Sequence, residues 1–300
     1  MFSQQLVNGV ALGSVYALIA LGYTMVYGIL GLINFAHGEI YMIGAYIGII
    51  TLGVFTAIGL TSYSLYLSLI LTFIISAFYC GAYGITMERV AYKPLRHAPR
   101  LSPLISAIGL SIFLQNYVMI AQGSADKVFP HIIPVGTITI LNASISYIQI
   151  LIITTSLLCM VCLHLFVKKS LLGKAMRAAA QDKTMASLLG VDIDNVISVT
   201  FIIGSILASA AGVMVAIYYG SINFFIGYVA GIKAFTAAVL GGIGNIPGAI
   251  LGGFLLGIVE SFGAAYISSE YKDAFAFLIL ILVLIIKPTG LLGEKVSEKV

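Results

Sequence analysis

Residues 63–87 read YSLYLSLILTFIISAFYCGAYGITM, a run of 25 residues without a single charged side chain. An α-helix of about 20 apolar residues crosses the ~30 Å hydrocarbon layer of a bilayer, so this run is long enough to span a membrane. Similar apolar runs fill most of the chain. We predict nine spans, at residues 5–27, 36–58, 63–87, 103–122, 149–167, 197–218, 232–250, 251–267 and 273–287.

The composition of the whole chain agrees with that prediction. Hydrophobic residues make up 60% of the 300 residues and charged residues only 9%, whereas a soluble domain carries about 25% charge. A surface with so little charge must face lipid, where only helices and closed barrels satisfy the backbone. Barrel strands alternate apolar and polar residues over roughly 10 positions, unlike these runs. The sequence therefore predicts an all-α polytopic integral membrane protein with one transmembrane domain over residues 1–300.

Basic residues predict how the chain is oriented. Residues 88–100 contain four Lys or Arg side chains, residues 168–195 five and residues 287–300 three, which is twelve of the 15 in the chain. Cytoplasmic loops accumulate Lys and Arg, so we expect all three segments, and the C-terminus, in the cytoplasm. The excursion 122–149, with its β-branched run VGTITI at 135–140, then lies outside as a short hairpin or surface segment. Three spans before Glu88 put the N-terminus outside as well.

Two stretches interrupt the apolar runs. Residues 28–44 read GILGLINFAHGEIYMIG, and residues 233–253 read KAFTAAVLGGIGNIPGAILGG. Gly and Pro disfavour helix interiors, and irregular backbone at membrane depth is tolerated where it lines a cavity or is buried in protein. Interrupted helices in a transporter point to the translocation route. Depending on how the first stretch is counted, the chain has eight to ten membrane segments.

Polar residues within the spans are the candidates for a pathway, because they are costly in lipid and often functional. We select Asn34, His37, Glu39, Lys233, Asn245 and Glu260. Glu39 and Lys233 also fit a simpler role at the ends of their spans, while Glu260 lies deeper and favours a pathway or a hydrogen-bonded role. His164 follows a CxxC at Cys159 and Cys162, but small packing residues explain that motif better than a metal site does.

Glycines spaced by four residues predict close helix packing. The pairs are Gly9/Gly13, Gly44/Gly48, Gly248/Gly252 and Gly253/Gly257. Such spacing lines up small residues on one helix face and lets two backbones approach.

One segment outside the spans is amphipathic. In residues 170–195, apolar side chains recur at helical spacing, at Met176, Ala179, Ala180, Met185, Leu188 and Leu189. Lys, Arg, Gln and Asp residues form the opposite, solvent-facing side. Gly190 is a plausible helix stop, and Asp192 or Asp194 would cap the next helix. Such a helix either lies on the bilayer surface or docks into a groove of a cytoplasmic partner.

Three runs carry a resemblance to a known family. Residues 178–201, AAAQDKTMASLLGVDIDNVISVTF, resemble the cytoplasmic coupling loop of ABC importer permeases, with Ala179, Ala180, Asp182, Gly190 and Val191 at the matching positions. The resemblance implies that these residues, except Val191, couple the chain to an ATPase, and we add the preceding Arg177 to them. Ala178 replaces the Glu that usually precedes the alanine pair, as is typical of the branched-chain subfamily. Residues 30–46 and 233–253 closely resemble signature stretches of the high-affinity branched-chain amino acid permeases, to which urea and short-amide permeases are similar.

The resemblance implies a permease subunit of an importer in a bacterial inner membrane. It further implies a homologous second permease subunit, two cytoplasmic ATPase subunits that bind the ATP, and a periplasmic substrate-binding protein. The chain itself shows no GxxxxGK[ST], HExxH or GxSxG motif, so we expect neither an enzyme nor a cofactor. A net charge of +4 gives no indication of nucleic-acid binding. The alternatives are an importer of urea or short amides and a passive channel, which would need no coupling helix.

Overall fold

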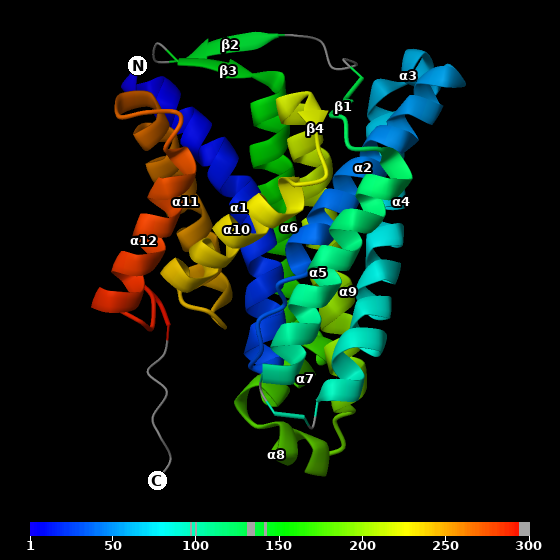
Figure 1. The fold of residues 1–300 in the computed structure, drawn as a ribbon, viewed down its shortest axis with the longest axis vertical. Helices are drawn as coiled ribbons and strands as arrows, with labels where there is room; N and C mark the ends of the chain where they lie inside the picture. Colours follow the sequence, from blue (N-terminus) through cyan, green and yellow to red (C-terminus); the bar gives the residue numbers. More distant parts are fainter. Residues whose placement is uncertain (97, 100, 131–135, 141–142, 294–300) are drawn as a thin grey trace.

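The computed structural model describes residues 1–300 apart from 97, 100, 131–135, 141–142 and 294–300. Within the described residues, seven helices are long and apolar enough to cross a membrane. They are α1 (Phe2–Leu30), α2 (His37–Ala57), α4 (Leu65–Met87), α5 (Leu101–Gln122), α6 (Tyr147–Lys169), α9 (Ile193–Tyr219) and α11 (Ile246–Tyr266). Two shorter apolar helices, α10 (Ile226–Gly241) and α12 (Lys272–Ile286), complete the bundle (Figure 1). The all-α polytopic membrane fold is confirmed.

The predicted boundary between the seventh and eighth spans, at residues 250 and 251, is wrong. Helix α10 ends at Gly241 and α11 begins at Ile246. Gly242 and Gly244 have φ angles of 107° and 95°, which are left-handed values that break the helix and that glycine adopts without strain. At 16 residues, α10 is about 24 Å long at 1.5 Å per residue, shorter than the hydrocarbon layer.

Helices α1 and α9 form the centre of the bundle. In the apolar 18-residue stretch of each helix, 89% is buried inside the structure in α1 and 78% in α9, against 22% in α5 and 28% in α6. Large apolar side chains such as Ile70, Phe78 and Ile112 are exposed on the outer helices. A surface of this kind is compatible with lipid rather than with water.

The two ends of the bundle differ (Figure 1). One end, the hairpin end, carries the N-terminus, the short helix α3 (Leu60–Tyr63) and the antiparallel strands β2 (Thr137–Ile140) and β3 (Ala143–Ser146). The strands β1 (Lys127–Val128) and β4 (Ser221–Ile222) pair there too. This confirms the predicted hairpin, whose predicted first residue, Val135, lies outside the described residues.

The opposite end, the basic end, carries α7 (Leu171–Gln181) and α8 (Lys183–Leu188). Helix α4 continues into a π-helical turn (Glu88–Tyr92) and a 3-10 turn (Lys93–Leu95). Lys93 forms an ion pair of 2.8 Å with Asp194 at the start of α9, so the first two basic segments lie at the same end. Arg100 and residues 294–300 of the tail lie outside the described residues.

Glycines of the predicted pairs form close helix contacts, as expected. A Cβ atom on Gly257 would lie 2.3 Å from the backbone nitrogen of Gly13, and one on Gly253 would lie 2.5 Å from Cα of Ala17. Helix α1 therefore packs backbone to backbone on α11. The same holds between α2 and α9, where a Cβ on Gly44 would lie 2.7 Å from Cα of Ser209.

Candidate functional site

The break between α10 and α11 is held by Asn245 and by the segment that follows α12. The Asn245 side chain accepts a hydrogen bond from the backbone N–H of Gly248 at 3.0 Å and so caps α11. Its Nδ2 donates to the carbonyl of Leu292 at 2.9 Å. The N–H of Leu292 donates to the carbonyl of Gly241, also at 2.9 Å. The C-terminal segment thus satisfies the end of α10, which would otherwise be costly within a membrane.

Lys233 and Glu260, predicted as separate pathway candidates, form a buried ion pair. Lys233 Nζ lies 2.6 Å from Oε1 of Glu260, and both side chains are at most 6% exposed. The hydroxyl of Tyr16 donates to Oε2 of the same carboxylate at 2.8 Å. Asp273, in the first turn of α12, lies 2.6 Å from Lys233 Nζ and is 46% exposed. Four helices, α1, α10, α11 and α12, therefore meet in one charged cluster.

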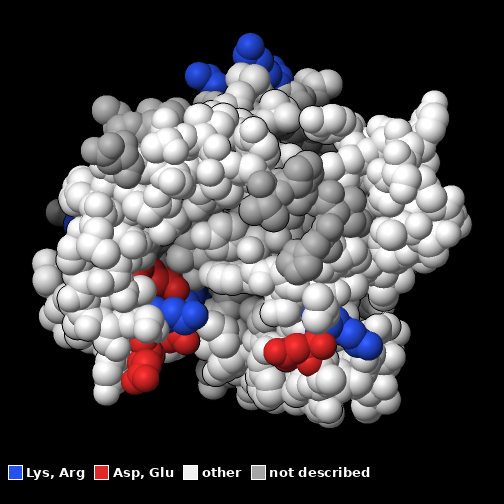
Figure 2. Space-filling model, turned by 90° about the horizontal axis from the view of Figure 1, so that it is seen from above, with Lys and Arg blue, Asp and Glu red and all other residues white. Residues whose placement is uncertain are grey.

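A cavity of about 270 Å³ adjoins this cluster. Its charged lining residues are Lys233, Glu260, Lys272 and Asp273. Apart from the polar residues Ser221 and Asn223, its remaining walls are apolar or aromatic, with residues such as Leu12, Val215, Val229, Tyr41 and Tyr219. Viewed from the hairpin end, acidic and basic side chains gather in a hollow on the side of α11 and α12 (Figure 2).

Glu39 belongs to a second buried site, between α2, α5 and α10. The side chain is 1% exposed, and its Oε1 accepts a hydrogen bond from Ser111 at 2.9 Å. Its Oε2 has no hydrogen-bond partner among the described residues. A Cβ on Gly227 of α10 would lie 2.5 Å from this oxygen. Glu39 is therefore buried in the bundle rather than placed at the interface, and only a glycine fits opposite it.

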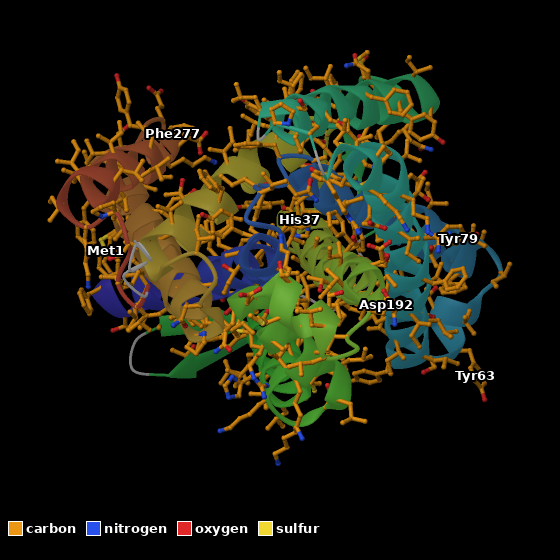
Figure 3. All side chains as sticks on the ribbon, turned by 90° about the horizontal axis from the view of Figure 1, so that it is seen from below. Met1, His37, Tyr63, Tyr79, Asp192 and Phe277 are labelled. Carbon is orange, nitrogen blue, oxygen red and sulfur yellow. The ribbon has the colours of Figure 1, made fainter. Side chains whose placement is uncertain are left out.

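His37 and Asn34 lie at the interruption between α1 and α2. In the view from the basic end, His37 lies near the middle of the bundle, whereas Tyr63 and Phe277 lie at its edge (Figure 3). The His37 ring packs edge-on against Tyr23 with 5.0 Å between ring centroids. The Asn34 side chain accepts hydrogen bonds from Tyr92 Oη at 2.6 Å and from the backbone N–H of Ala36 at 3.0 Å. Asn34 thereby stabilises the non-helical backbone before α2.

The amphipathic segment consists of two helices, which corrects the single helix expected from its periodicity. Helix α7 ends at Gln181 and α8 begins at Lys183. The carboxylate of Asp182 accepts a hydrogen bond from the N–H of Met185 at 3.0 Å and caps α8. Gly190, with a φ angle of 86°, follows the end of α8. Asp192 caps α9 through the N–H of Asn195 at 3.1 Å.

Both helices are tied to the bundle. The guanidinium of Arg177 donates to the carbonyl of Val167 at the end of α6, and Lys183 Nζ donates to the carbonyl of Leu30 at 3.1 Å. Leu30 is the last residue of α1. Partial burial, followed by the charge of Arg96, lowers the pKa of Lys183. The α7–α8 segment is therefore anchored directly to two membrane helices.

The predicted apolar face of this segment is divided between two surfaces. Met176 and Ala179 of α7 are buried against the bundle. Ala180 is exposed and lines a cavity of about 80 Å³ together with Gly244 of the α10–α11 turn. On and just after α8, Met185, Leu188 and Leu189 are 60%, 77% and 84% exposed. An apolar surface thus remains at the basic end, outside the bundle.

Comparison with known proteins shows the family to which the chain belongs. Residues 5–284 match the family described as "Branched-chain amino acid transport system / permease component". The chain belongs to this permease family.

Individual members of the family match over the whole chain. The permease is 54% identical over 303 residues to the high-affinity branched-chain amino acid transport system permease protein BraD of Pseudomonas aeruginosa. It is 51% identical over 303 residues to the protein of that description named LivH in Escherichia coli strain K12. Both matches cover 100% of this chain and 98% of the relative. No solved structure matches the permease.

Several residues of the permease's charged sites were not selected from the sequence. Asp273 and Lys272 stand at the start of a span, where charged residues normally reach the interface. Tyr16 and Ser111 are ordinary residues of apolar runs, and only the fold shows that they contact Glu260 and Glu39. Among the described residues of the permease, no group of three or more His, Cys, Asp or Glu side chains is placed to hold a metal ion.

Proposed function

We propose that this chain is the membrane-spanning permease subunit of a binding-protein-dependent ABC importer that carries leucine, isoleucine and valine. The relatives with 51–54% identity are named as permease proteins of high-affinity branched-chain amino acid transport systems, which supports this substrate class over urea or short amides. The importer works by alternating access, driven by ATP that separate ATPase subunits bind.

The observation that carries the coupling mechanism is the α7–α8 segment. Its exposed residues Met185, Leu188 and Leu189 present an apolar surface of the kind that a groove in a partner protein accepts. Its other contacts lead into the bundle, through Lys183 to the end of α1. Movement of an ATPase groove would therefore pull on α1 and on the α10–α11 turn beside Ala180. A passive channel has no need of such a connection.

The proposed partners follow from this arrangement. Two ATPase subunits bind the basic end, one on each permease, and a homologous second permease completes the pore. A periplasmic binding protein delivers the substrate at the hairpin end. The basic loops support this orientation in a bacterial inner membrane, with the C-terminus in the cytoplasm. The glycine contacts between α1 and α11 provide smooth faces along which helices can shift between two packings.

We assign the pathway to the polar residues buried around α10. Lys233 on α10 pairs with Glu260, and Glu39 lies opposite Gly227 of the same helix. Asn34 supports the break before α2, and Asn245 supports the break after α10. His37, the first residue of α2, packs against Tyr23 of α1. Helix α10 is therefore the element whose movement would open or close the route.

Radiolabelled uptake tests this function. A strain lacking its own branched-chain systems receives the complete importer, and initial leucine uptake is measured with isoleucine, valine or urea in competition. We expect competition by the two amino acids and none by urea. Uptake competed only by urea or amides would assign the alternative substrate class. Uptake that persists when the catalytic glutamates of the ATPase partners are replaced would identify a passive channel.

A further inference from the structure

We propose that the cavity beside α10 and α12 binds the zwitterionic head group of an amino acid by inserting it between Lys233 and Asp273. This inference rests on the proposed transport function and deepens it, because it assigns a substrate site to the permease itself. The residues concerned are Lys233 and Asp273, with Glu260, Tyr16 and Lys272 as their surroundings.

The charges that line the cavity balance. Two ammonium groups, of Lys233 and Lys272, face two carboxylates, of Glu260 and Asp273. Burying an unpaired charge is expensive, so a balanced cavity disfavours a ligand with a net charge. A zwitterion brings one charge of each sign and keeps the balance.

The two ion pairs of Lys233 differ in how easily a ligand reaches them. The pair with Glu260 is enclosed, since both side chains are at most 6% exposed and Tyr16 occupies the second carboxylate oxygen. The Asp273 side chain is 46% exposed, so a ligand can reach this carboxylate, although the Oδ1 atom that contacts Lys233 is itself buried. A ligand entering the cavity therefore meets the Asp273 carboxylate first and reaches Lys233 by separating this pair.

An amino acid exchanges one ion pair for two. Its α-carboxylate takes the place of Asp273 beside the Lys233 ammonium, while its α-ammonium takes the place of Lys233 beside Asp273. Lys233 keeps Glu260 throughout, so no buried charge loses its last partner. An uncharged amide or urea offers only dipoles, which compete poorly with a charge-assisted contact. The exchange therefore selects zwitterions.

The rest of the cavity suits an aliphatic side chain. Leu12, Val215, Ile226 and Val229 supply apolar wall beside the charged residues. Burying methyl and methylene groups there is favourable. Charged side chains gather in a hollow that is visible from the hairpin end (Figure 2), which is the end assigned to substrate delivery. An amino acid arriving there meets the head-group site first.

Calorimetric titration of the complete importer in nanodiscs, without the binding protein, tests the proposal. The ligands are leucine, leucinamide, which lacks the carboxylate, and 4-methylpentanoate, which lacks the ammonium group. We expect leucine to bind at least tenfold more tightly than either analogue. In Asp273→Asn, leucine affinity should fall about tenfold, while 4-methylpentanoate affinity stays the same or rises, because a competing carboxylate has been removed.

Glu270→Gln is the matched control, since Glu270 is an exposed carboxylate three residues before Asp273 and outside the cavity. It should bind all three ligands as the wild type does. A purely structural role for Asp273 would weaken leucine and 4-methylpentanoate alike, and that result overturns the proposal, as does unchanged leucine affinity. If wild-type cells take up leucine but the importer shows no leucine binding, only this site fails. If wild-type cells take up no leucine, the proposed function fails instead.

Discussion

The hydroxyl of Tyr16 on α1 donates a hydrogen bond of 2.8 Å to Oε2 of Glu260 on α11. The other oxygen, Oε1, is occupied by Lys233 Nζ at 2.6 Å. Both oxygens of one buried carboxylate are therefore held by side chains from two different helices. Because buried polar groups are costly when unpaired, this arrangement joins α1, α10 and α11 by their polar contacts as well as by their glycine faces.

Tyr16→Phe should destabilise the permease by about 1–3 kcal/mol, the range for leaving a buried acceptor unsatisfied. The ring keeps its packing, so the chain should still insert into the membrane. The measurement is the thermal unfolding midpoint of the purified complex in detergent. Tyr63→Phe, at an exposed position on α3, is the control and should leave the midpoint unchanged. Equal midpoints for both variants would show that the Tyr16 hydroxyl contributes nothing.

Lys233 and Glu260 should show strong coupling in a double-mutant cycle. Lys233→Met leaves a buried carboxylate with Tyr16 alone, and breaking such a pair costs about 3–5 kcal/mol. Glu260→Gln should cost less, because Lys233 keeps Asp273 as a partner. The double variant buries neither charge, so its loss should be smaller than the sum of the single losses by about 1–3 kcal/mol. Additive losses of stability, measured by the same unfolding assay, would contradict the pairing.

Length and polarity predicted much of the fold but not its interior contacts. Apolar runs identify spans because a lipid-facing helix must be apolar along its length, and seven of the nine predicted spans match α1, α2, α4, α5, α6, α9 and α12 within a few residues. The boundary after α10 was misplaced because Ile246–Ala249 is as apolar as the helix before it. The Gly- and Pro-rich stretch 233–253 indicated an interruption, and the left-handed φ angles at Gly242 and Gly244 show where in this stretch the chain turns.

The sequence predicted which residues form the candidate site but not which of them contact each other. Lys233 and Glu260 are detectable because charge within a span is rare, yet nothing in the sequence places them 2.6 Å apart. That distance depends on how the α10–α11 turn aligns the two helices. The same limit applies to Asp182, which the helical period of residues 174–189 did not show to be a cap. Its carboxylate ends one helix and starts another.

Gly253→Ala should separate α1 from α11. The new Cβ would lie 2.5 Å from the backbone N and Cα of Ala17, and overpacking of this kind costs about 1–3 kcal/mol. Gly53→Ala on α2 is the matched control, because nothing lies within 4 Å of its Cβ position. We expect a lower unfolding midpoint and lower uptake for Gly253→Ala only. Wild-type behaviour would show that the two helices can move apart without loss.

Leu188→Asn should reduce the amount of ATPase subunit that copurifies with the permease about tenfold, since it places an amide in the apolar surface offered to the partner groove. Ile58→Asn, a similarly exposed apolar position at the hairpin end, should copurify the ATPase normally. If Leu188→Asn also retains its ATPase, α8 is an interfacial helix that lies on the bilayer. Quantitative immunoblotting of the purified complexes distinguishes these outcomes.

Asp182→Ala and Gly190→Val should uncouple ATP hydrolysis from uptake. The first removes the hydrogen bond to Met185 that caps α8, a loss of about 1 kcal/mol of helix stability. The second places a β-branched residue at a φ angle of 86°, which costs about 1–2 kcal/mol. Each change misorients α8 at the basic end and leaves the spans intact.

In proteoliposomes that contain either α8 variant, ATPase activity should persist while leucine uptake falls at least tenfold. Asp126→Ala, at the hairpin end, is the control and should couple hydrolysis to uptake normally. Normal coupling in both variants would show that this segment is not the docking site. Another contact would then have to transmit the movement of the ATPase subunits to the permease.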